Sequence, residues 1–257
     1  MSRGPAKFFL LPIAALLLGS CGLMVPEPFI EPVRDIDREL NNWATIDFSA
    51  YNAVSAFTHF VIFYRIYVSA ADIPATTTGT FPTISPALAA DFNAISPFID
   101  SDTMFGVNMH SVFSGRNFRY LALAGGQDIS TVLTGAMTMG SIVEFDFSHS
   151  QSVPVMRVGA AGPPLYLWRA TGHHSPGLSF SPQPDRYFRN SDALRDRHNI
   201  NLQFNADVAD TPAAVLETAR RYTYAALFIV AVGMNPNTFA NVYSTPSLIH
   251  VFQLPSP

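Results

Sequence analysis

Short apolar stretches separated by turn residues run through most of the chain after Trp43. The clearest stretch is residues 57–69, FTHFVIFYRIYVS, whose aromatic and β-branched side chains are typical of a strand. Near the end, residues 222–232, YTYAALFIVAV, are apolar on both faces, which predicts a central strand packed on both sides. The hydrophobic pattern therefore predicts a mainly β protein.

Other apolar segments predict further strands, bounded by glycine- and proline-containing turns. A closing strand around residues 248–252 is expected to pair with residues 222–232. Many short strands without a βαβ rhythm favour an antiparallel sandwich or barrel. The remaining expected strands lie at residues 44–49, 118–124, 131–138, 141–148, 153–158, 165–170 and 199–206.

Helices are expected in only a few places. Apolar residues recur at helical spacing in residues 85–97, between a proline suited to a first helical turn and Pro97, which would end the helix. A second short helix is expected at residues 212–219, and a helical turn at residues 34–40. Prolines precede that turn, and residues 21–42 are interpreted as a tether.

The first 20 residues have the pattern of a secretory signal. A basic start is followed by an apolar run at residues 8–18, well short of the roughly 20 residues that span a bilayer. The run closes with Leu18-Gly19-Ser20-Cys21, which resembles the lipobox of bacterial lipoproteins. The resemblance implies cleavage before Cys21, lipid on that residue and attachment to a membrane. Because Gly22 stands where many lipoproteins of the inner membrane have Asp, it also implies the outer membrane.

Composition then excludes several kinds of chemistry. The only lysine, Lys7, leaves with the signal, as does Arg3, so the 237-residue mature chain has 13 arginines against 19 acidic residues, a net charge of −6 with histidine neutral. A mildly acidic chain without a basic block is a poor candidate for binding nucleic acid. No Schiff-base lysine or P-loop is available, and lipid on Cys21 leaves no thiol nucleophile. No cofactor or metal is expected.

Two pairs of segments resemble fibronectin type III and other immunoglobulin-like sandwiches. Residues 222–232, a loop ending in Ser244-Thr245-Pro246 and the strand after it are similar to the last two strands of that fold. Residues 46–48 and 63–69 resemble its second and third strands. The resemblance implies a β-sandwich at residues 43–257 with a large β-rich insertion at about 70–221, and it implies a spacer or recognition surface rather than an activity.

Titratable clusters offer few candidates for a site. Glu144 and Asp146 are expected to share one strand face, as a glycosidase pair would require, but the alternation around them favours a solvated face. The pair His173-His174 is interpreted as a loop, because adjacent histidines in a β conformation face opposite sides. Asp35, Asp37 and Glu39 lack the glycine of a calcium loop and are interpreted as a charged linker face.

Tyr166 and Trp168 are expected on one strand face, where they could stack on a sugar or a peptide, although such pairs are more often core. The favoured hypothesis is a non-enzymatic envelope module for binding, adhesion or assembly. The alternatives are a carrier of small apolar ligands or lipids, suggested by 21 phenylalanines, and an envelope glycan hydrolase. A pocket lined by phenylalanine would favour the carrier, carboxylates in a cleft the hydrolase, and a filled core the binding module.

Overall fold

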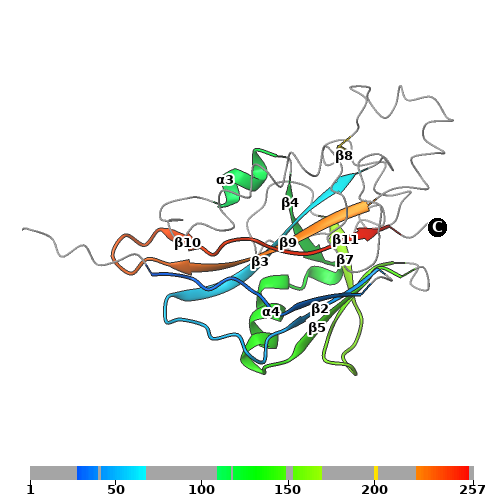
Figure 1. Ribbon diagram of the computed structural model, residues 1–257, viewed down its shortest axis with the longest axis horizontal. Coiled ribbons are helices and arrows are strands. Elements are labelled where there is room, and N and C mark those ends of the chain that lie inside the picture. Colours follow the sequence, from blue (N-terminus) through cyan, green and yellow to red (C-terminus); the bar gives the residue numbers. More distant parts are fainter. Residues whose placement is uncertain are drawn as a thin grey trace, which may run out of the picture.

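The computed structural model describes residues 28–39, 42–67, 109–116, 118–148, 153–169, 200–201 and 224–254. Within these residues the protein is mainly β, with eleven strands and two α-helices (Figure 1). The prediction of a mainly β protein is confirmed. The lipobox, His173-His174 and the helices expected at 85–97 and 212–219 lie outside the described residues.

The strands form one sheet in the order β1-β2-β5-β6-β7-β4-β3-β9-β10, with β11 also on β9 and β8 on β3. All pairs are antiparallel except β3 with β8. The helices are α3 (Met109–Ser114) and α4 (Ile129–Thr138), and a 3₁₀ turn, η3, spans Ala124–Gly126. The strands are β1 (Ile36–Glu39), β2 (Trp43–Asp47), β3 (Phe57–Tyr67), β4 (Arg119–Leu123), β5 (Ile142–Asp146), β6 (Val155–Val158), β7 (Leu165–Arg169), β8 (Ile200–Asn201), β9 (Tyr224–Met234), β10 (Asn241–Tyr243) and β11 (Ser247–Gln253).

Strands β3 and β9 form the centre of the sheet and pair along almost their whole length. One face of β9 enters the main core together with α4, and the other face enters a second core that includes Phe113 of α3. The predictions that this segment is buried on both faces and pairs with the closing strand are therefore confirmed. The first face carries Ala225, Leu227, Ile229 and Ala231, and the second carries Ala226, Phe228, Val230 and Val232.

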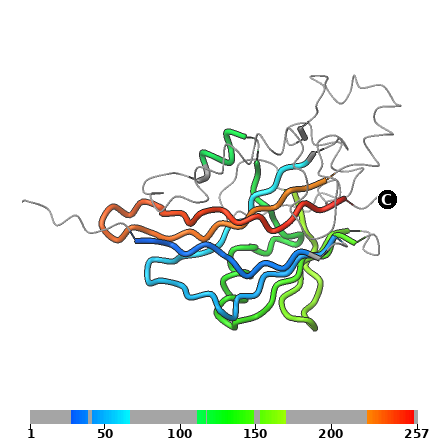
Figure 2. Tube along the Cα trace, viewed as in Figure 1, coloured from blue at the N-terminus to red at the C-terminus, as the bar shows by residue number. Residues whose placement is uncertain are grey.

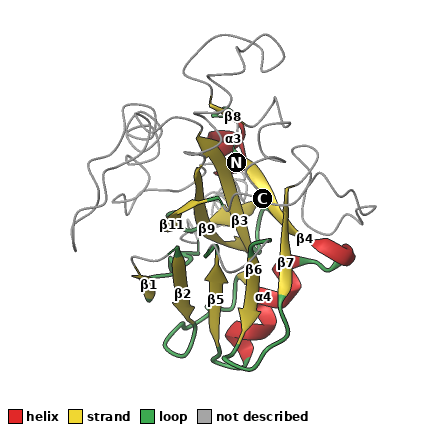
Figure 3. Cartoon of the chain, turned by 90° about the vertical axis from the view of Figure 1, so that its right-hand side faces the viewer, coloured by secondary structure: helices red, strands yellow, loops and turns green. Residues whose placement is uncertain are grey.

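The sheet curls until β1 and β2, early in the described chain, lie beside β11, near its end (Figures 2 and 3). Side chains join this seam between β1 and β11. Arg38 donates through Nε to the carbonyl of Ile249 at 3.0 Å and through Nη2 to that of Leu248 at 2.5 Å. The amide of Asn42 bonds both the N–H and the C=O of Gln253, at 2.8 and 2.9 Å, so it substitutes for a strand residue.

Stability is expected to fall as the pH is lowered from about 6.5 toward 4, because of His250 at this seam. Burial, with the charge of Arg38, lowers the pKa of His250 from 6.5 to about 4. The unfolded chain therefore binds the proton first, and it binds more protons than the folded state across that interval. The loss should be about 1–3 kcal/mol, and melting temperatures measured from pH 4 to 7 will report it.

The control for this prediction is His250→Gln, which keeps a polar side chain but does not titrate. Its melting temperature should depend less on pH than that of the unaltered protein between pH 4 and 6.5. Burial also lowers the pKa of His59, opposed by Asp128, so part of the dependence should remain. An identical pH profile in the variant would mean that His250 does not contribute.

Two local predictions were wrong. Residues 131–138 were expected to form a strand, but they belong to α4, because Asp128 caps the helix and Leu133 and Ala136 reach the core at helical spacing. The helical turn expected at residues 34–40 is instead strand β1, paired with β2. The alternation of exposed and half-buried residues in β1 fits an edge of the sheet.

The boundaries of the fold also differ from those expected. Ile30 and Val33, within the predicted tether, are buried in the main core, so the folded part of the chain begins before Trp43. Strands β4, β5, β6 and β7 fall within the proposed insertion, yet they form the stretch of sheet that connects β2 to β3. Of the strand expected at residues 199–206, the structure describes Ile200–Asn201. Among the described residues, no helix has the length and apolar character needed to cross a membrane.

Candidate functional site

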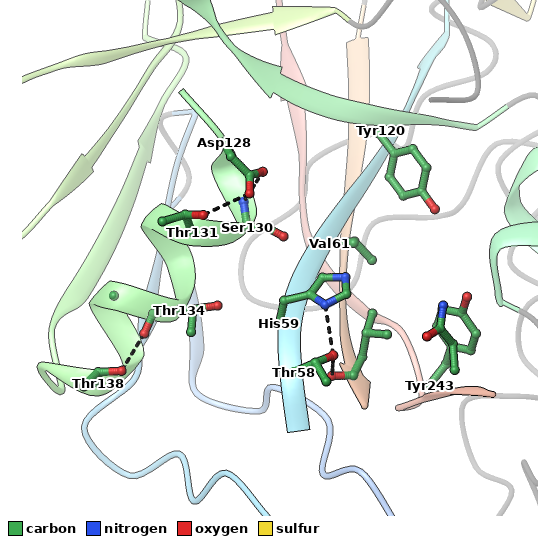
Figure 4. Close-up of a pocket in the computed structure, with 13 residues that line it drawn as sticks. Thr58, His59, Val61, Tyr120, Asp128, Ser130, Thr131, Thr134, Thr138 and Tyr243 are labelled. Atoms are coloured by element: carbon green, nitrogen blue, oxygen red, sulfur yellow. Dashed lines mark hydrogen bonds between the residues drawn. The ribbon is translucent and has the colours of Figure 1, made fainter. Parts of the chain in front are cut away.

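A pocket of about 920 Å³ lies between α4 and strands β3, β4, β9 and β10 (Figure 4). Hydroxyl groups, two phenol rings, one imidazole and one carboxylate surround it. Neither lysine nor arginine occurs among the 13 described residues of its wall. They are Thr58, His59, Val61, Tyr120, Asp128, Ser130, Thr131, Thr134, Gly135, Thr138, Val232, Asn241 and Tyr243.

The first turn of α4 forms one side of the pocket, and Asp128 fixes it. One carboxylate oxygen of Asp128 accepts the backbone N–H of Ser130 at 3.1 Å, and the other accepts the hydroxyl of Thr131 at 3.0 Å. Such a cap satisfies donors that the first helical turn leaves unpaired. The hydroxyl of Ser130 donates to the carbonyl of Phe60 at 2.9 Å, which ties the helix to β3.

A row of threonines continues along α4. Thr131, Thr134 and Thr138 are spaced three and four residues apart, which places them on one face of a helix, and all three line the pocket. Thr138 donates its hydroxyl proton to the carbonyl of Thr134 at 2.9 Å. Its oxygen lone pairs therefore stay available to accept hydrogen bonds from a bound molecule.

Strand β3 contributes Thr58 and His59, whose side chains are hydrogen-bonded to each other (Figure 4). Thr58 donates its hydroxyl proton to the carbonyl of Val232 at 2.9 Å, so the same oxygen accepts from Nδ1 of His59, also at 2.9 Å. The neutral imidazole therefore carries its proton on Nδ1 and a lone pair on Nε2. Burial lowers the pKa of His59 and Asp128 raises it by less, so the ring is neutral at pH 7.

Two tyrosines form the opposite side. Tyr120 comes from β4 and Tyr243 from β10, and in Figure 4 both rings lie across from α4, with His59 between. Burial, with a smaller contribution from Tyr243, raises the pKa of Tyr120, so its phenol stays protonated and can donate a hydrogen bond. Aromatic rings beside donors and acceptors suit a ligand that has both apolar and hydroxyl-bearing surfaces.

Two of the wall residues, Thr58 and Asp128, are held in structural hydrogen bonds. A threonine nucleophile would have to donate its proton to a base, but Thr58 donates to a carbonyl and accepts from His59. Both oxygens of Asp128 are engaged in capping α4. Neither group is therefore arranged as a nucleophile and base pair.

The carboxylates predicted from the sequence form a separate structural cluster. Glu144 and Asp146 do share a face of β5, and Arg157 of β6 contacts them through Nη1 at 2.8 and 3.4 Å. The solvated-face interpretation is wrong for Asp146, which is buried and accepts from the indole N–H of Trp43 at 2.8 Å and from the backbone N–H of Ser148 at 2.9 Å. The cluster joins β2, β5 and β6.

The charge state of Asp146 does not suit the general acid of a glycosidase pair. Burial raises its pKa, but hydrogen bonds from Ser148, Trp43 and Arg157 together outweigh that effect, and the net pKa lies below the usual value. An acid that is ionised at neutral pH has no proton to give to a leaving group. Asp146 thus has the chemistry of a structural anion.

The predicted aromatic pair on β7 is divided between surface and core. Tyr166 is 47% exposed, whereas Trp168 is only 4% exposed, so the two rings do not form a flat exposed platform.

The acidic residues Asp35 and Asp37 are both exposed at the start of the described chain. Among the described residues, no group of three or more His, Cys, Asp or Glu side chains could hold a metal ion.

Sequence reasoning missed the pocket because α4 was interpreted as a strand. The signal was present, since Asp128 precedes a helical spacing of Thr131, Thr134 and Thr138. The contributions of Tyr120 and Tyr243 depend on tertiary folding and have no local signal. No family model, curated protein or solved structure matches the chain.

Proposed function

We propose that this protein is a lipid-anchored module of the bacterial cell envelope that binds a neutral, hydroxyl-rich ligand such as a sugar. The observation that carries the binding proposal is the hydroxyl-lined pocket between α4 and the tyrosines of β4 and β10. The anchoring proposal is supported by the lipobox-like Leu18-Gly19-Ser20-Cys21 after a basic and apolar start. An outer-membrane location follows from the same resemblance, through Gly22.

The chemistry of the wall selects the ligand class. An anionic ligand is disfavoured, because the wall contains the carboxylate of Asp128 and a neutral His59. No arginine or lysine among the described wall residues could balance the charge of such a ligand. A purely apolar ligand would leave several hydroxyls without water or a partner, which is costly. A neutral sugar presents C–H surface to the rings of Tyr120 and Tyr243 and hydroxyls to the threonines.

The two alternative functions have less support. A carrier of apolar ligands would require a cavity lined by phenylalanines, but the described wall residues of this pocket include no phenylalanine, and many of the described phenylalanines fill the two cores. A glycan hydrolase would use Glu144 and Asp146, which instead share the guanidinium of Arg157. Both observations favour a binding module.

We also propose a relation of the central strands to fibronectin type III and immunoglobulin-like sandwiches. Its support is that β9 pairs with β11 and with β3, the segments on which the resemblance rests. Sandwiches divide their strands between two packed sheets. Here β4, β5, β6 and β7 continue one curled sheet, so the proposed relation is limited to the central strands.

Replacement of Asn241 with alanine is expected to weaken ligand binding about five- to tenfold, the effect of losing roughly one hydrogen bond. Asn241 lines the pocket, and its side chain is exposed, so the fold should be unaffected. Isothermal titration calorimetry with glucose, galactose, N-acetylglucosamine and their disaccharides identifies the preferred sugar. Palmitate and glucose 6-phosphate serve as the apolar and anionic comparisons.

Asn237→Ala is the matched control, because Asn237 is an exposed asparagine of the β9–β10 connection, four residues before Asn241, and is not among the pocket residues. It should bind the preferred sugar as the unaltered protein does. Tighter binding of palmitate than of every sugar would favour the carrier function. Equal effects of the two alanine variants would contradict binding in this pocket.

A further inference from the structure

Four exposed apolar side chains gather at one end of the β3–β9 pair. They are 55%, 40%, 41% and 74% exposed and define the apolar tip: Phe29, Val54, Met234 and Phe239. Figure 1 shows the β9–β10 connection, the loop before β3 and the start of the described chain at this same end. The tip is therefore built from three segments that are far apart in the sequence.

Hydrogen bonds and contacts fix these segments together. The backbone N–H of Met234 donates to the carbonyl of Ala56 at 2.9 Å, and that of Phe57 donates to the carbonyl of Val54, also at 2.9 Å. Ile30, the neighbour of Phe29, packs against Gly233, where a Cβ would collide with the Ile30 side chain and approach the Ala56 carbonyl to 2.7 Å. The turn with Phe239 is closed by its N–H donating to Asn235 at 2.8 Å.

Two of the three segments that carry the tip have no formal charge, whereas the segment with Phe29 has Glu27 and Glu31 on either side. Residues 48–56, FSAYNAVSA, and residues 234–246, MNPNTFANVYSTP, contain no acidic residue, lysine, arginine or histidine. Exposed apolar side chains that occur singly are ordinary on a protein surface, whereas a group of them marks a site of contact with a protein or a membrane. Uncharged loops with exposed aromatic and apolar side chains are characteristic of surfaces that rest in the interfacial region of a bilayer.

The position of the anchor selects the partner. Pro28, the first described residue, lies seven positions after Cys21, and even fully extended this stretch spans at most roughly 25 Å. A lipid on Cys21 would therefore hold the membrane close to this end of the fold and not to the opposite end. The proposed anchor would not bring a second copy of the chain or another protein to this end in the same way.

We propose that the apolar tip rests in the interface of the membrane to which Cys21 is anchored, so that the protein stands on the bilayer in a fixed orientation. The inference rests on the proposed lipid anchor. Thr58 and Val232 line the pocket. Thr58 is one residue from Phe57 and four from Val54, and Val232 is two residues from Met234. The pocket would therefore open close to the headgroups.

The test uses the full-length lipidated protein in vesicles whose lipids carry bromine on the acyl chains, a quencher of tryptophan fluorescence. Phe239→Trp places a reporter on the tip, and Tyr166→Trp places one on β7, away from the tip (Figure 1). The native Trp43 and Trp168 are present in both variants, so the emission of the unaltered protein is subtracted from each. Vesicle flotation measures anchoring separately from the fluorescence.

The proposal predicts that the emission added by Phe239→Trp falls about twofold or more in brominated vesicles, because tip side chains would lie about 5–10 Å into the interface. The emission added by Tyr166→Trp should not change. A further Val54→Asp substitution in the Phe239→Trp protein should restore the emission, since a carboxylate opposes burial of the tip.

Protein that floats with the vesicles but shows no selective quenching at residue 239 would overturn the tip proposal and leave the anchor intact. Protein that does not float would overturn both the anchor and the tip proposal. Emission at residue 239 that depends on protein concentration but not on bromine would identify a contact between copies, and the membrane proposal would be wrong.

Discussion

Phe228→Ala is expected to lower the free energy of unfolding by about 3–5 kcal/mol. Phe228 is fully buried on β9, and its ring centroid lies 5.6 Å from those of both Phe113 and Phe118. The buried residues of this second core are at most 3% exposed, so truncation would leave a cavity between β9 and α3. The expected loss is a large part of the 5–15 kcal/mol that stabilises a typical domain.

Phe239→Ala provides the matched control, because it removes the same atoms from a ring that is 74% exposed. Its effect on the free energy of unfolding should lie within about 0.5 kcal/mol. Urea denaturation of the two variants beside the unaltered protein measures both changes. Similar midpoints for Phe228→Ala and the unaltered protein would mean that the second core does not stabilise the fold.

The centre of the fold could be predicted from local patterns. Residues 57–69 and 222–232 are rich in apolar, aromatic and β-branched side chains, as buried strands are, and their described parts lie in the central strands β3 and β9. The two faces of β9 could be assigned residue by residue because side chains alternate along a strand. Pairing with β11 followed from the short connection and the apolar pattern of the closing strand.

The error at α4 has a local cause. Thr131, Val132 and Thr134 are β-branched and favour strands by propensity, whereas the Asp128 cap and the burial of Leu133 and Ala136 favour a helix. The tertiary contacts outweighed the propensity. Because all of the pocket threonines on the helix depend on this assignment, the same error concealed the candidate site.

The curl of the sheet had no signal in the sequence. Its seam depends on Arg38 and Asn42 bonding to backbone groups of β11 about 210 residues away. Asn42 adopts a left-handed conformation, with φ of 61°, which asparagine tolerates better than most residues. No local pattern distinguishes these two residues from other polar side chains in a linker, so the segment was interpreted as a tether.

Cys21→Ala is expected to abolish membrane anchoring. In the lipoproteins that the signal resembles, the thiol of this residue accepts the lipid, and cleavage follows lipidation. Without the thiol the chain should remain uncut or be released unanchored, because a single unlipidated domain keeps no stable hold on a bilayer. Fractionation of cells with immunoblotting against the C-terminal part measures the change.

Ser20→Ala is the control for this substitution, since it keeps a small residue before the cleavage point and leaves the thiol in place. It should fractionate with membranes as the unaltered protein does. If Cys21→Ala also stays in the membrane fraction as a processed chain, the attachment must come from a part of the protein other than this residue.

The central claim, a lipid-anchored envelope module, is tested most directly by the intact mass of the protein purified from membranes. The account predicts a chain of residues 21–257 whose mass exceeds that of the polypeptide by the lipid on Cys21. The excess should disappear on proteolytic removal of the first residues, which would locate it there. A soluble protein of unmodified mass with residues 1–20 still attached would contradict the account.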